Sequence, residues 1–345
     1  MPRFTVTILA ASLWTFAGCA AEAGPVDTGK VEAASTDEMD ERQVVLDRVA
    51  KAIKDEDFAA LDAMALEYRS SRARTPSGVW KLAVYHAGLQ AYLGKGLQRE
   101  EGCTYRMADF VRRWREAGGD QPAAVITDAS LLSARGWCVR GPGYANTVSG
   151  ADWKAFEESA KAASALLERH KQKASVDPEF YAVSVKTYPA LDRLGKPLAD
   201  LVDEASRREP YYHRTYFNAA FYYLPQWGGS MAQVDEFARY AAHQTRESDK
   251  TGMYARIYWS LEQCGCDVMR EAADWDDMKQ AMRDVQARYP SPFNADHFMQ
   301  VSCTMGDEEE GLHFIRAGAP PGTGDDALVA RIRTCRTMAH DPSES

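Results

Sequence analysis

The sequence lacks a hydrophobic run long enough to cross a membrane. Its longest apolar segment is FTVTILAASLWTF, at residues 4–16. At about 1.5 Å rise per residue, a helix of that length spans roughly 20 Å, against a hydrocarbon core of about 30 Å. This shortage excludes a membrane protein with several spanning helices.

Positive charge is also scarce. The 345 residues contain 41 Lys and Arg against 50 Asp and Glu, which gives a net charge of −9 at pH 7. Proteins that bind nucleic acid normally carry a basic surface, so we expect no nucleic-acid partner. For the same reason we expect contact with the membrane only through an N-terminal lipid, and not through adhesion to anionic headgroups.

Local sequence patterns of catalysis are missing as well. The seven His residues include no pair at i, i+4 and no His-Glu-x-x-His, and there is no Gly-x-Ser-x-Gly. Gly141-Pro142-Gly143-Tyr144 is not followed by the Lys-Ser/Thr pair of a phosphate loop. Glu308-Glu309-Glu310 begins a predicted helix, where acidic residues favour the helix dipole. We therefore predict a binding protein with no catalytic residue, no metal and no cofactor.

The N-terminus has the pattern of a signal peptide over residues 1–18. Arg3 is followed by the apolar segment, and small residues precede Cys19. The ending Phe16-Ala17-Gly18-Cys19 resembles a bacterial lipobox, usually Leu-Ala-Gly-Cys, which implies lipid attachment to the Cys19 sulfur. Because Ala follows the cysteine where Asp would imply inner-membrane retention, the resemblance implies an outer-membrane lipoprotein that faces the periplasm. The alternative is a plain signal peptide cleaved near Ala21 or Ala23, and a secreted or periplasmic protein.

Composition divides the rest of the chain into three parts. Residues 19–38 contain no aromatic residue and only two Val as branched apolar residues, which predicts a flexible tether. Residues 39–340 carry the apolar periodicity of a folded domain, and residues 341–345 are predicted to be a disordered tail.

Six cysteines remain besides Cys19, and an even number in an oxidising compartment predicts disulfides. Cys103 and Cys138 lie on consecutive predicted helices, which favours their pairing. Among the other four, Cys264 and Cys266 could each pair with one of Cys303 and Cys335. A metal site at Cys264-Gly265-Cys266 is a less favoured alternative, because the flanking Cys or His residues of a zinc site are missing.

Apolar residues recur at intervals of three and four from residue 39 onward, with no run of strict alternation. The pattern predicts an all-α chain of about fifteen helices, over residues 43–53, 58–68, 80–91, 103–117, 122–137, 152–170, 178–194, 197–208, 211–224, 231–244, 252–264, 274–289, 293–304, 308–317 and 325–338. Because a single bundle does not easily accommodate fifteen helices, stacked helix pairs are the expected solution.

The spacing of large, small and aromatic residues fits a tetratricopeptide repeat. Positions 4, 7, 8 and 11 of the pattern match Tyr216, Ala219, Ala220 and Tyr223, and match again, further along the chain, Tyr254, Ile257, Tyr258 and Leu261. Ala205 precedes Pro210 by the same interval that separates Val285 from Pro290, and Gly306-Asp307 resembles the turn within a repeat. These matches predict a right-handed tetratricopeptide-like α-solenoid.

Several segments also resemble a family of bacterial proteins of unknown function with a tetratricopeptide-like fold. The segments are Arg140-Gly141-Pro142-Gly143-Tyr144, Glu209-Pro210-Tyr211-Tyr212, Leu224-Pro225-Gln226-Trp227-Gly228-Gly229-Ser230 and Tyr254-Ala255-Arg256-Ile257-Tyr258. The resemblance covers about residues 75–340. It implies a fold and no particular activity.

Residues 211–227 are unusually rich in rings, and four of them share one helix face: Tyr212, Tyr216, Tyr223 and Trp227. Aromatic residues on the concave side of a helical solenoid are common anchors for a partner. Packing between repeats is the interpretation that we favour for these rings, and a binding groove lined by them is the alternative. Trp227 lies at a Gly-rich corner where Gly228-Gly229 ends one helix and Ser230 caps the next.

The function expected from these features is a protein–protein binding adaptor whose partner is another envelope protein. One alternative is a hydrolase or lyase for cell-wall polysaccharide, which requires two carboxylates about 5–10 Å apart in a cleft beside Trp227. A minor alternative is an immunity lipoprotein that neutralises a toxin. The sequence gives no basis for predicting a small-molecule ligand.

Overall fold

We describe the protein from a computed structural model. It describes residues 36–95, 97–99, 102–104, 108–143, 145–263, 268–319 and 323–340. The signal peptide, Cys19, tether residues 19–35, Cys264, Cys266 and residues 341–345 lie outside the described residues.

The described residues form sixteen α-helices and no β-strand, which confirms the all-α prediction. The first eight helices are α1 (Thr36–Lys54), α2 (Phe58–Ser71), α3 (Lys81–Leu93), α4 (Ala108–Gly118), α5 (Pro122–Arg140), α6 (Gly150–Ala174), α7 (Glu179–Thr187) and α8 (Lys196–Arg208). The next eight are α9 (Arg214–Ala220), α10 (Met231–Asp249), α11 (Gly252–Glu262), α12 (Val268–Ala272), α13 (Trp275–Arg288), α14 (Pro292–Thr304), α15 (Glu308–Gly318) and α16 (Asp325–His340).

Short 3₁₀ helices occupy four of the connections: Ala145–Thr147, Pro189–Leu191, Phe221–Tyr223 and Pro225–Trp227. The helix α12 was not predicted, because its few residues are too short a run to show a helical period. The predicted tether is also too long at its C-terminal end. Residues 36–38 belong to α1, and Glu38 is buried.

Helix caps account for several boundaries. The side chains of Ser149 and Ser230 accept hydrogen bonds from backbone N–H groups in the first turns of α6 and α10. Asp307 does the same at the start of α15. Each of these caps satisfies a backbone donor that a helix start leaves without a partner. Gly228 has φ of +84°, the left-handed conformation predicted for the corner before α10.

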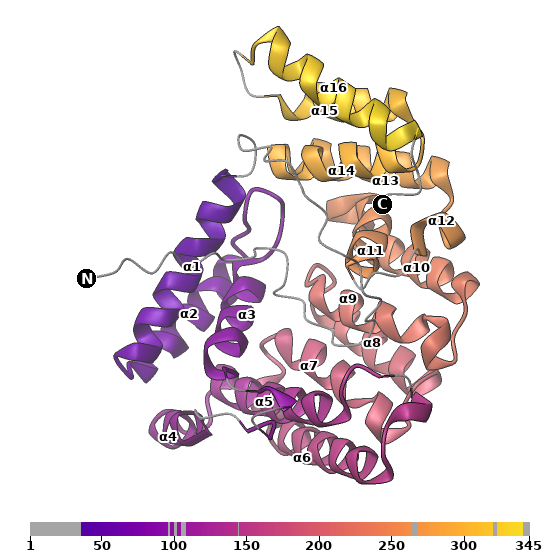
Figure 1. The fold of residues 1–345 in the computed structure, drawn as a ribbon. Helices are drawn as coiled ribbons and strands as arrows, with labels where there is room; N and C mark the ends of the chain where they lie inside the picture. The colour runs from indigo at the N-terminus through magenta and orange to yellow at the C-terminus, as the bar shows by residue number, and fades with distance from the viewer. Residues whose placement is uncertain are drawn as a thin grey trace.

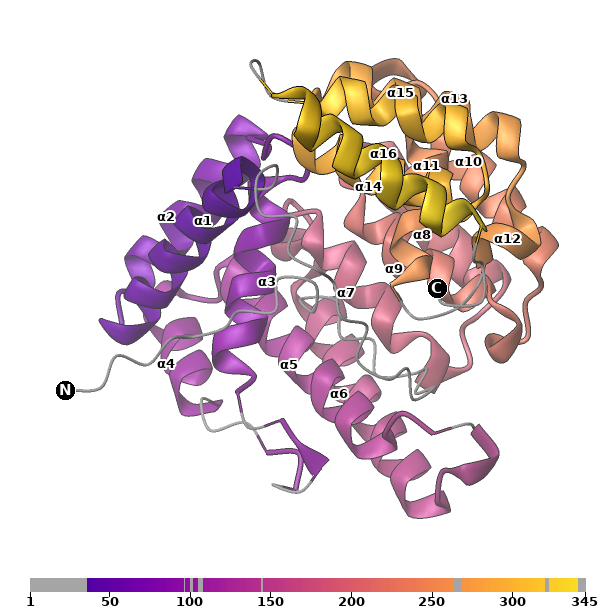
Figure 2. The ribbon, with the colours of Figure 1, turned by 45° about the horizontal axis from the view of Figure 1, so that its top comes forward.

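The helices follow one another along an arc (Figure 1). It runs from α5 and α6 through α7 to α9 and on to α14, α15 and α16. Within it, α5 contacts α7, α7 contacts α9, and α9 contacts α11, in addition to contacts between successive helices. The N-terminal helices α1, α2 and α3 lie on the open side of this arc, and Figure 2 shows α3 between α1 and α7.

The buried apolar side chains form two clusters. The larger one runs from Val125 in α5 to Cys335 in α16. The smaller one joins α1 to α5 and also includes Ala182 of α7 and Tyr212. The ring of Trp80 meets that of Tyr212 edge-on, with 5.6 Å between their centroids. The N-terminal helices are therefore packed onto the rest of the molecule through apolar and aromatic contacts.

Two disulfides link segments of the described chain. Cys103 pairs with Cys138, as predicted. Cys303 of α14 pairs with Cys335 of α16. The suggested pairing of each of these two cysteines with Cys264 or Cys266 is therefore wrong. The positions of Cys303 and Cys335 in the sequence do not reveal that these two residues pair. Their disulfide depends on the packing of α16 against α14. Among the described helices, none is long and apolar enough to cross a membrane.

Candidate functional site

The four rings that were candidates for a groove do not form a common surface. Tyr212 and Tyr216 are each 1% exposed, so they are packing residues of the interior. The hydroxyl of Tyr212 donates to Glu179 Oε2 at 2.7 Å. The half-buried ring of Tyr223 stacks on Phe237, with 4.6 Å between centroids. The candidate aromatic groove is therefore filled by the protein itself.

Trp227 is half-buried and takes part in an aromatic cluster around the guanidinium of Arg140. That guanidinium lies 5.4 Å from the Trp227 ring centroid, 5.4 Å from Trp153 and 5.7 Å from Trp137. Trp227 also meets Trp137 edge-on at 5.6 Å. Such cation–π contacts hold the segment after α9 against the end of α5. The described contacts of the Trp227 ring are with other rings and with this cation, and none is with a carboxylate.

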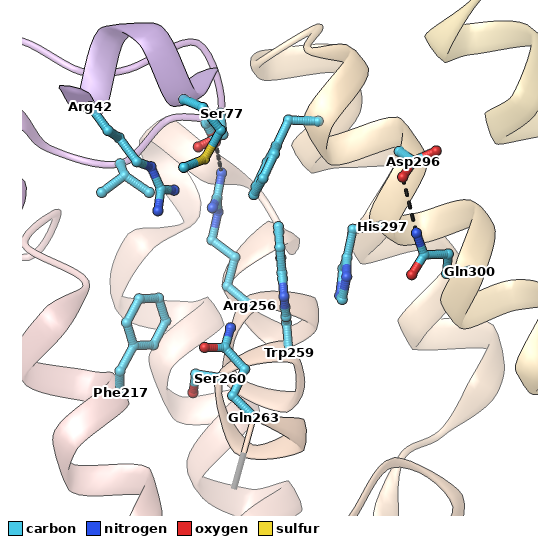
Figure 3. Close-up of a pocket in the computed structure, with 13 residues that line it drawn as sticks. Arg42, Ser77, Phe217, Arg256, Trp259, Ser260, Gln263, Asp296, His297 and Gln300 are labelled. Carbon is cyan, nitrogen blue, oxygen red and sulfur yellow. Dashed lines mark hydrogen bonds between the residues drawn. The ribbon is translucent and has the colours of Figure 1, made fainter. Parts of the chain in front are cut away.

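A cavity of about 500 Å³ lies elsewhere, between the N-terminal segment and the helices of the arc. Its size falls within the range of about 300–1,000 Å³ that is typical of small-ligand pockets. Figure 3 shows the side chains that line it. They are Met39 and Arg42 of α1, Ser77 and Val79 of the loop before α3, Phe217 of α9, Arg256, Trp259, Ser260 and Gln263 at α11, and Phe293, Asp296, His297 and Gln300 of α14.

One wall of this cavity, which we call the inner cavity, is a stack of two rings. Trp259 and His297 lie 3.7 Å apart between centroids, with 14° between their planes. Phe293 lies 5.8 Å from Trp259. In Figure 3 the Trp259 ring stands between His297 on one side and Arg256 and Phe217 on the other. The stack with His297 holds the indole in one orientation at the cavity wall.

His297 is held in its neutral form. Part of its ring lines the inner cavity, whereas its Nε2 atom is buried and has no hydrogen-bond partner among the described residues. Burial lowers the pKa of His297 to about 3, because the charged imidazolium would lose its hydration. At neutral pH this side chain acts as a flat, uncharged ring and is a poor proton acceptor.

Arg256 joins the arc to the N-terminal segment. Its guanidinium is buried and donates from Nη2 to the carbonyl oxygen of Ser77 at 2.5 Å, while Asn294 donates to the same oxygen at 3.3 Å. The Tyr289 ring lies 5.5 Å from this guanidinium. Desolvation lowers the pKa of Arg256 from its usual value. The side chain nevertheless stays a cation at neutral pH, because arginine titrates far above it.

The second cation of the inner cavity, Arg42, comes from α1. Its Nε lies 2.6 Å from Glu38 Oε1, and its guanidinium lies 5.4 Å from the Phe293 ring centroid. Glu38 also accepts hydrogen bonds from the Ser77 N–H at 2.7 Å and the Thr75 hydroxyl at 2.9 Å. The Glu38 carboxylate therefore fixes both Arg42 and the loop that carries Ser77.

The acidic residue in the cavity lining, Asp296, is already paired. Its Oδ1 lies 2.6 Å from Arg331 of α16, and its Oδ2 accepts a hydrogen bond from Gln300 at 3.0 Å. Both oxygens are thus occupied by side chains of the protein. Within the described part of the chain, no group of three or more His, Cys, Asp or Glu is arranged to hold a metal ion.

Sequence reasoning missed the inner cavity entirely. A weak pattern was present, because Arg256, Trp259, Ser260 and Gln263 recur at helical spacing, as do Phe293, His297 and Gln300. Mixed polar and aromatic faces of this kind are also common in ordinary packed helices. Arg42 and Ser77 join them only through the fold, from a distant segment near the start of the folded chain.

Comparisons with protein-family models, with curated proteins and with solved structures found no match to this chain.

Proposed function

We propose that this protein is a non-catalytic ligand-binding lipoprotein of the bacterial envelope, and that the inner cavity is its binding site. The observation that carries the proposal is the cavity itself, about 500 Å³ in volume, with a stacked aromatic wall and two guanidinium groups. A preformed cavity with a few convergent polar groups is the usual form of a small-molecule site. Lipid on Cys19 and a tether to the outer membrane are part of the proposal.

The state of the titratable groups favours binding over catalysis. His297 is uncharged near pH 7, because burial lowers its pKa to about 3, and both oxygens of Asp296 are paired. A glycoside hydrolase needs two available carboxylates, one of them able to donate a proton. The hydrolase alternative requires such a pair beside Trp227, whose described contacts consist of aromatic rings and Arg140.

A right-handed tetratricopeptide-like solenoid is the architecture that we propose for the arc. Successive helices pack as pairs, and α5, α7, α9 and α11 form a second series of contacts, as expected when helix pairs stack on their neighbours. The repeat-like positions Ala219, Ala220, Tyr254, Ile257 and Tyr258 are all buried on α9 and α11. The N-terminal helices occupy the open side of the arc and convert a groove into the inner cavity.

The proposal predicts that the full-length protein carries or captures a small molecule. The experiment is to purify the lipoprotein from membranes in mild detergent, denature it and identify the released compounds by mass spectrometry. Trp259→Leu removes the aromatic wall, so it should lose the compound that the wild type releases. Trp153→Leu changes a tryptophan outside the cavity and is the matched control. Equal release from wild type and Trp259→Leu, or no release from either, would contradict the proposal.

A protein-binding adaptor is the second candidate. It is favoured by the position of Gln263 and Gln300, which line the cavity and are exposed, since amide side chains suit the backbone of an inserted chain segment. Reversible crosslinking in cells, followed by purification and mass spectrometry, tests it. One stoichiometric envelope protein, lost with Trp259→Leu and retained with Trp153→Leu, would establish the adaptor and identify its partner.

A further inference from the structure

The acidic groups around the inner cavity have more of their hydrogen-bonding capacity used than the cationic groups have. Its carboxylate Asp296 and the adjoining carboxylate Glu38 have their oxygens engaged by side chains and backbone of the protein. The two cations, Arg42 and Arg256, keep unused donors. A cavity that offers donors and holds its acceptors engaged is complementary to an anion.

Arg42 has the larger unused capacity. Only its Nε is engaged, by Glu38, and its two terminal nitrogens have no hydrogen-bond partner among the described residues. The side chain is 19% exposed and lines the inner cavity, so it is open to a ligand there. A guanidinium held at Nε by a fixed carboxylate presents its outer edge in one orientation, and that edge matches the two oxygens of a carboxylate or phosphate.

Arg256 adds charge from a less accessible position. It forms no ion pair within 4 Å among the described residues, and its hydrogen bond goes to a neutral carbonyl, that of Ser77. The two acids that act on it electrostatically, Asp249 and Glu38, are themselves engaged. Asp249 is bonded to His213 and Tyr289, and Glu38 to Arg42 and the Ser77 N–H. The Arg256 guanidinium therefore adds positive charge beside the cavity, in a medium where charge is weakly screened.

The apolar part of the cavity has a definite shape. Trp259 is backed by His297, so the indole is a rigid, flat surface, and Phe217, Val79 and Met39 line the same space. Flat surfaces of this kind favour planar rings, which stack at small cost in conformational entropy. A volume of about 500 Å³ holds a fused bicyclic ring with one polar substituent.

We propose that the ligand of the inner cavity is a small organic anion, a planar ring that carries a carboxylate or a phosphate. The ring lies against Trp259, and the anionic group is bound by Arg42, with Arg256 contributing positive charge. This inference rests on the proposed function and names the chemistry of its ligand. Carboxylate and phosphate share the recognition by guanidinium groups, and the experiment below separates them.

The test compares three probes that share one ring system. Full-length lipoprotein in mild detergent is titrated by calorimetry with 2-naphthoate, with 2-naphthyl phosphate and with the neutral 2-naphthamide, and detergent alone is the blank. At least one of the two anions should bind about tenfold more tightly than the amide, because a charge-assisted hydrogen bond contributes more than a neutral one. Raising the ionic strength should weaken the binding of the anion and leave the binding of the amide unchanged.

Variants of one helix provide the control. Arg42→Gln should lose the preference for the anion, roughly a tenfold loss of affinity. Arg48→Gln, also on α1 but paired with Glu67 outside the cavity, should bind like the wild type. Arg42→Lys keeps the charge and loses the two-pronged edge, so it should retain part of the preference. Circular dichroism melts verify that each variant is folded.

Each outcome decides the inference. An anion preference that disappears in Arg42→Gln and persists in Arg48→Gln supports it, and the tighter of the two anions identifies the acid group. Equal binding of the amide and both anions overturns it, while the inner cavity remains a ring-binding site. Failure of all three probes also overturns it, and the proposed function is then decided separately by the compounds released from the purified protein.

Discussion

Arg256 of α11 donates a hydrogen bond to the carbonyl oxygen of Ser77, which lies 179 positions earlier in the chain. This contact links the N-terminal helices to the arc at the edge of the inner cavity. The residue after Ser77, Gly78, has φ of +93°, a conformation that residues with a Cβ rarely adopt. A Cβ at this position would stand 2.7 Å from the Tyr289 ring and 2.8 Å from Arg256 Nη2.

Gly78→Ala should therefore lower the free energy of unfolding by about 2–4 kcal/mol, the sum of backbone strain and steric displacement. Urea unfolding with the disulfides intact measures it. Gly119 is the matched control, because its φ is +61° and a Cβ there would meet no atom within 4 Å. Gly119→Ala should show only the backbone part, about 1 kcal/mol. Equal effects of the two substitutions would contradict the close approach at Gly78.

The disulfide Cys303–Cys335 should show coupling to Gly311. A Cβ on Gly311 would lie 2.6 Å from Cys303 Sγ and 2.7 Å from Cys335 Sγ, so Gly311→Ala should be strongly destabilising in the oxidised protein. In a Cys303→Ala/Cys335→Ala background the same substitution should be much milder. A double-mutant cycle by urea unfolding measures the difference, and additive effects would contradict coupling between Gly311 and the disulfide.

Removing that disulfide should itself lower stability by about 2–4 kcal/mol, since it joins cysteines at a sequence separation of 32. Hydrogen exchange should increase first in α16, which the bridge ties to α14. The Cys103→Ala/Cys138→Ala variant is the control, because it should leave the exchange of α16 unchanged.

Intact mass decides the state of Cys264 and Cys266. Two disulfides lower the mass by about four units relative to the fully reduced protein, and a third lowers it by about six, at roughly one hydrogen per thiol. Export to an oxidising compartment predicts the third bridge. Alkylation of two thiols in protein taken from the periplasm, without prior reduction, would contradict it.

Trp227→Ala should lower stability and leave ligand binding in the inner cavity unchanged. The substitution removes a ring that packs on Trp137 and on the Arg140 guanidinium, which we expect to reduce the free energy of unfolding by about 2–4 kcal/mol. Calorimetric titration with 2-naphthoate at a temperature where the variant is folded measures binding. A selective loss of ligand binding in a Trp227→Ala protein of normal stability would instead support a binding groove at Trp227.

Stability should fall as the pH is lowered from about 6.5 toward 4. Burial lowers the pKa of His297 to about 3 and that of His213 to about 4, below the value of 6.5 expected in the unfolded chain. Between these values the unfolded state binds more protons, so protonation favours unfolding by up to about 1.4 kcal/mol per pH unit for each group.

Urea unfolding across this pH range measures the effect. His297→Phe keeps a flat ring against Trp259 and should make the pH dependence shallower. His243→Phe, at an exposed histidine of α10, should leave it unchanged. Parallel curves for the wild type and His297→Phe would show that His297 is not held neutral.

The sequence determined the helical class and most helix positions, because these depend on local periodicity and caps. Ser149, Ser230 and Asp307 cap the helices that they precede, and Gly228 adopts the predicted positive φ. Cys103 and Cys138 form the predicted disulfide, although Cys103 lies in a turn and not on a helix. The helix caps and the turn at Gly228 are decided within a few residues of the chain.

Only the tertiary structure decided which aromatic residues are available to a ligand. Tyr212 and Tyr216 have the composition of a binding face but are buried. Tyr212 packs against Trp80 in the N-terminal cluster, and Tyr216 lies in the larger apolar cluster of the arc. The inner cavity depends instead on Arg42 and Ser77 meeting Arg256 and Trp259, which lie far away in the sequence. Helical periodicity shows that a side chain shares a face with its neighbours, and only long-range packing determines what lies opposite that face.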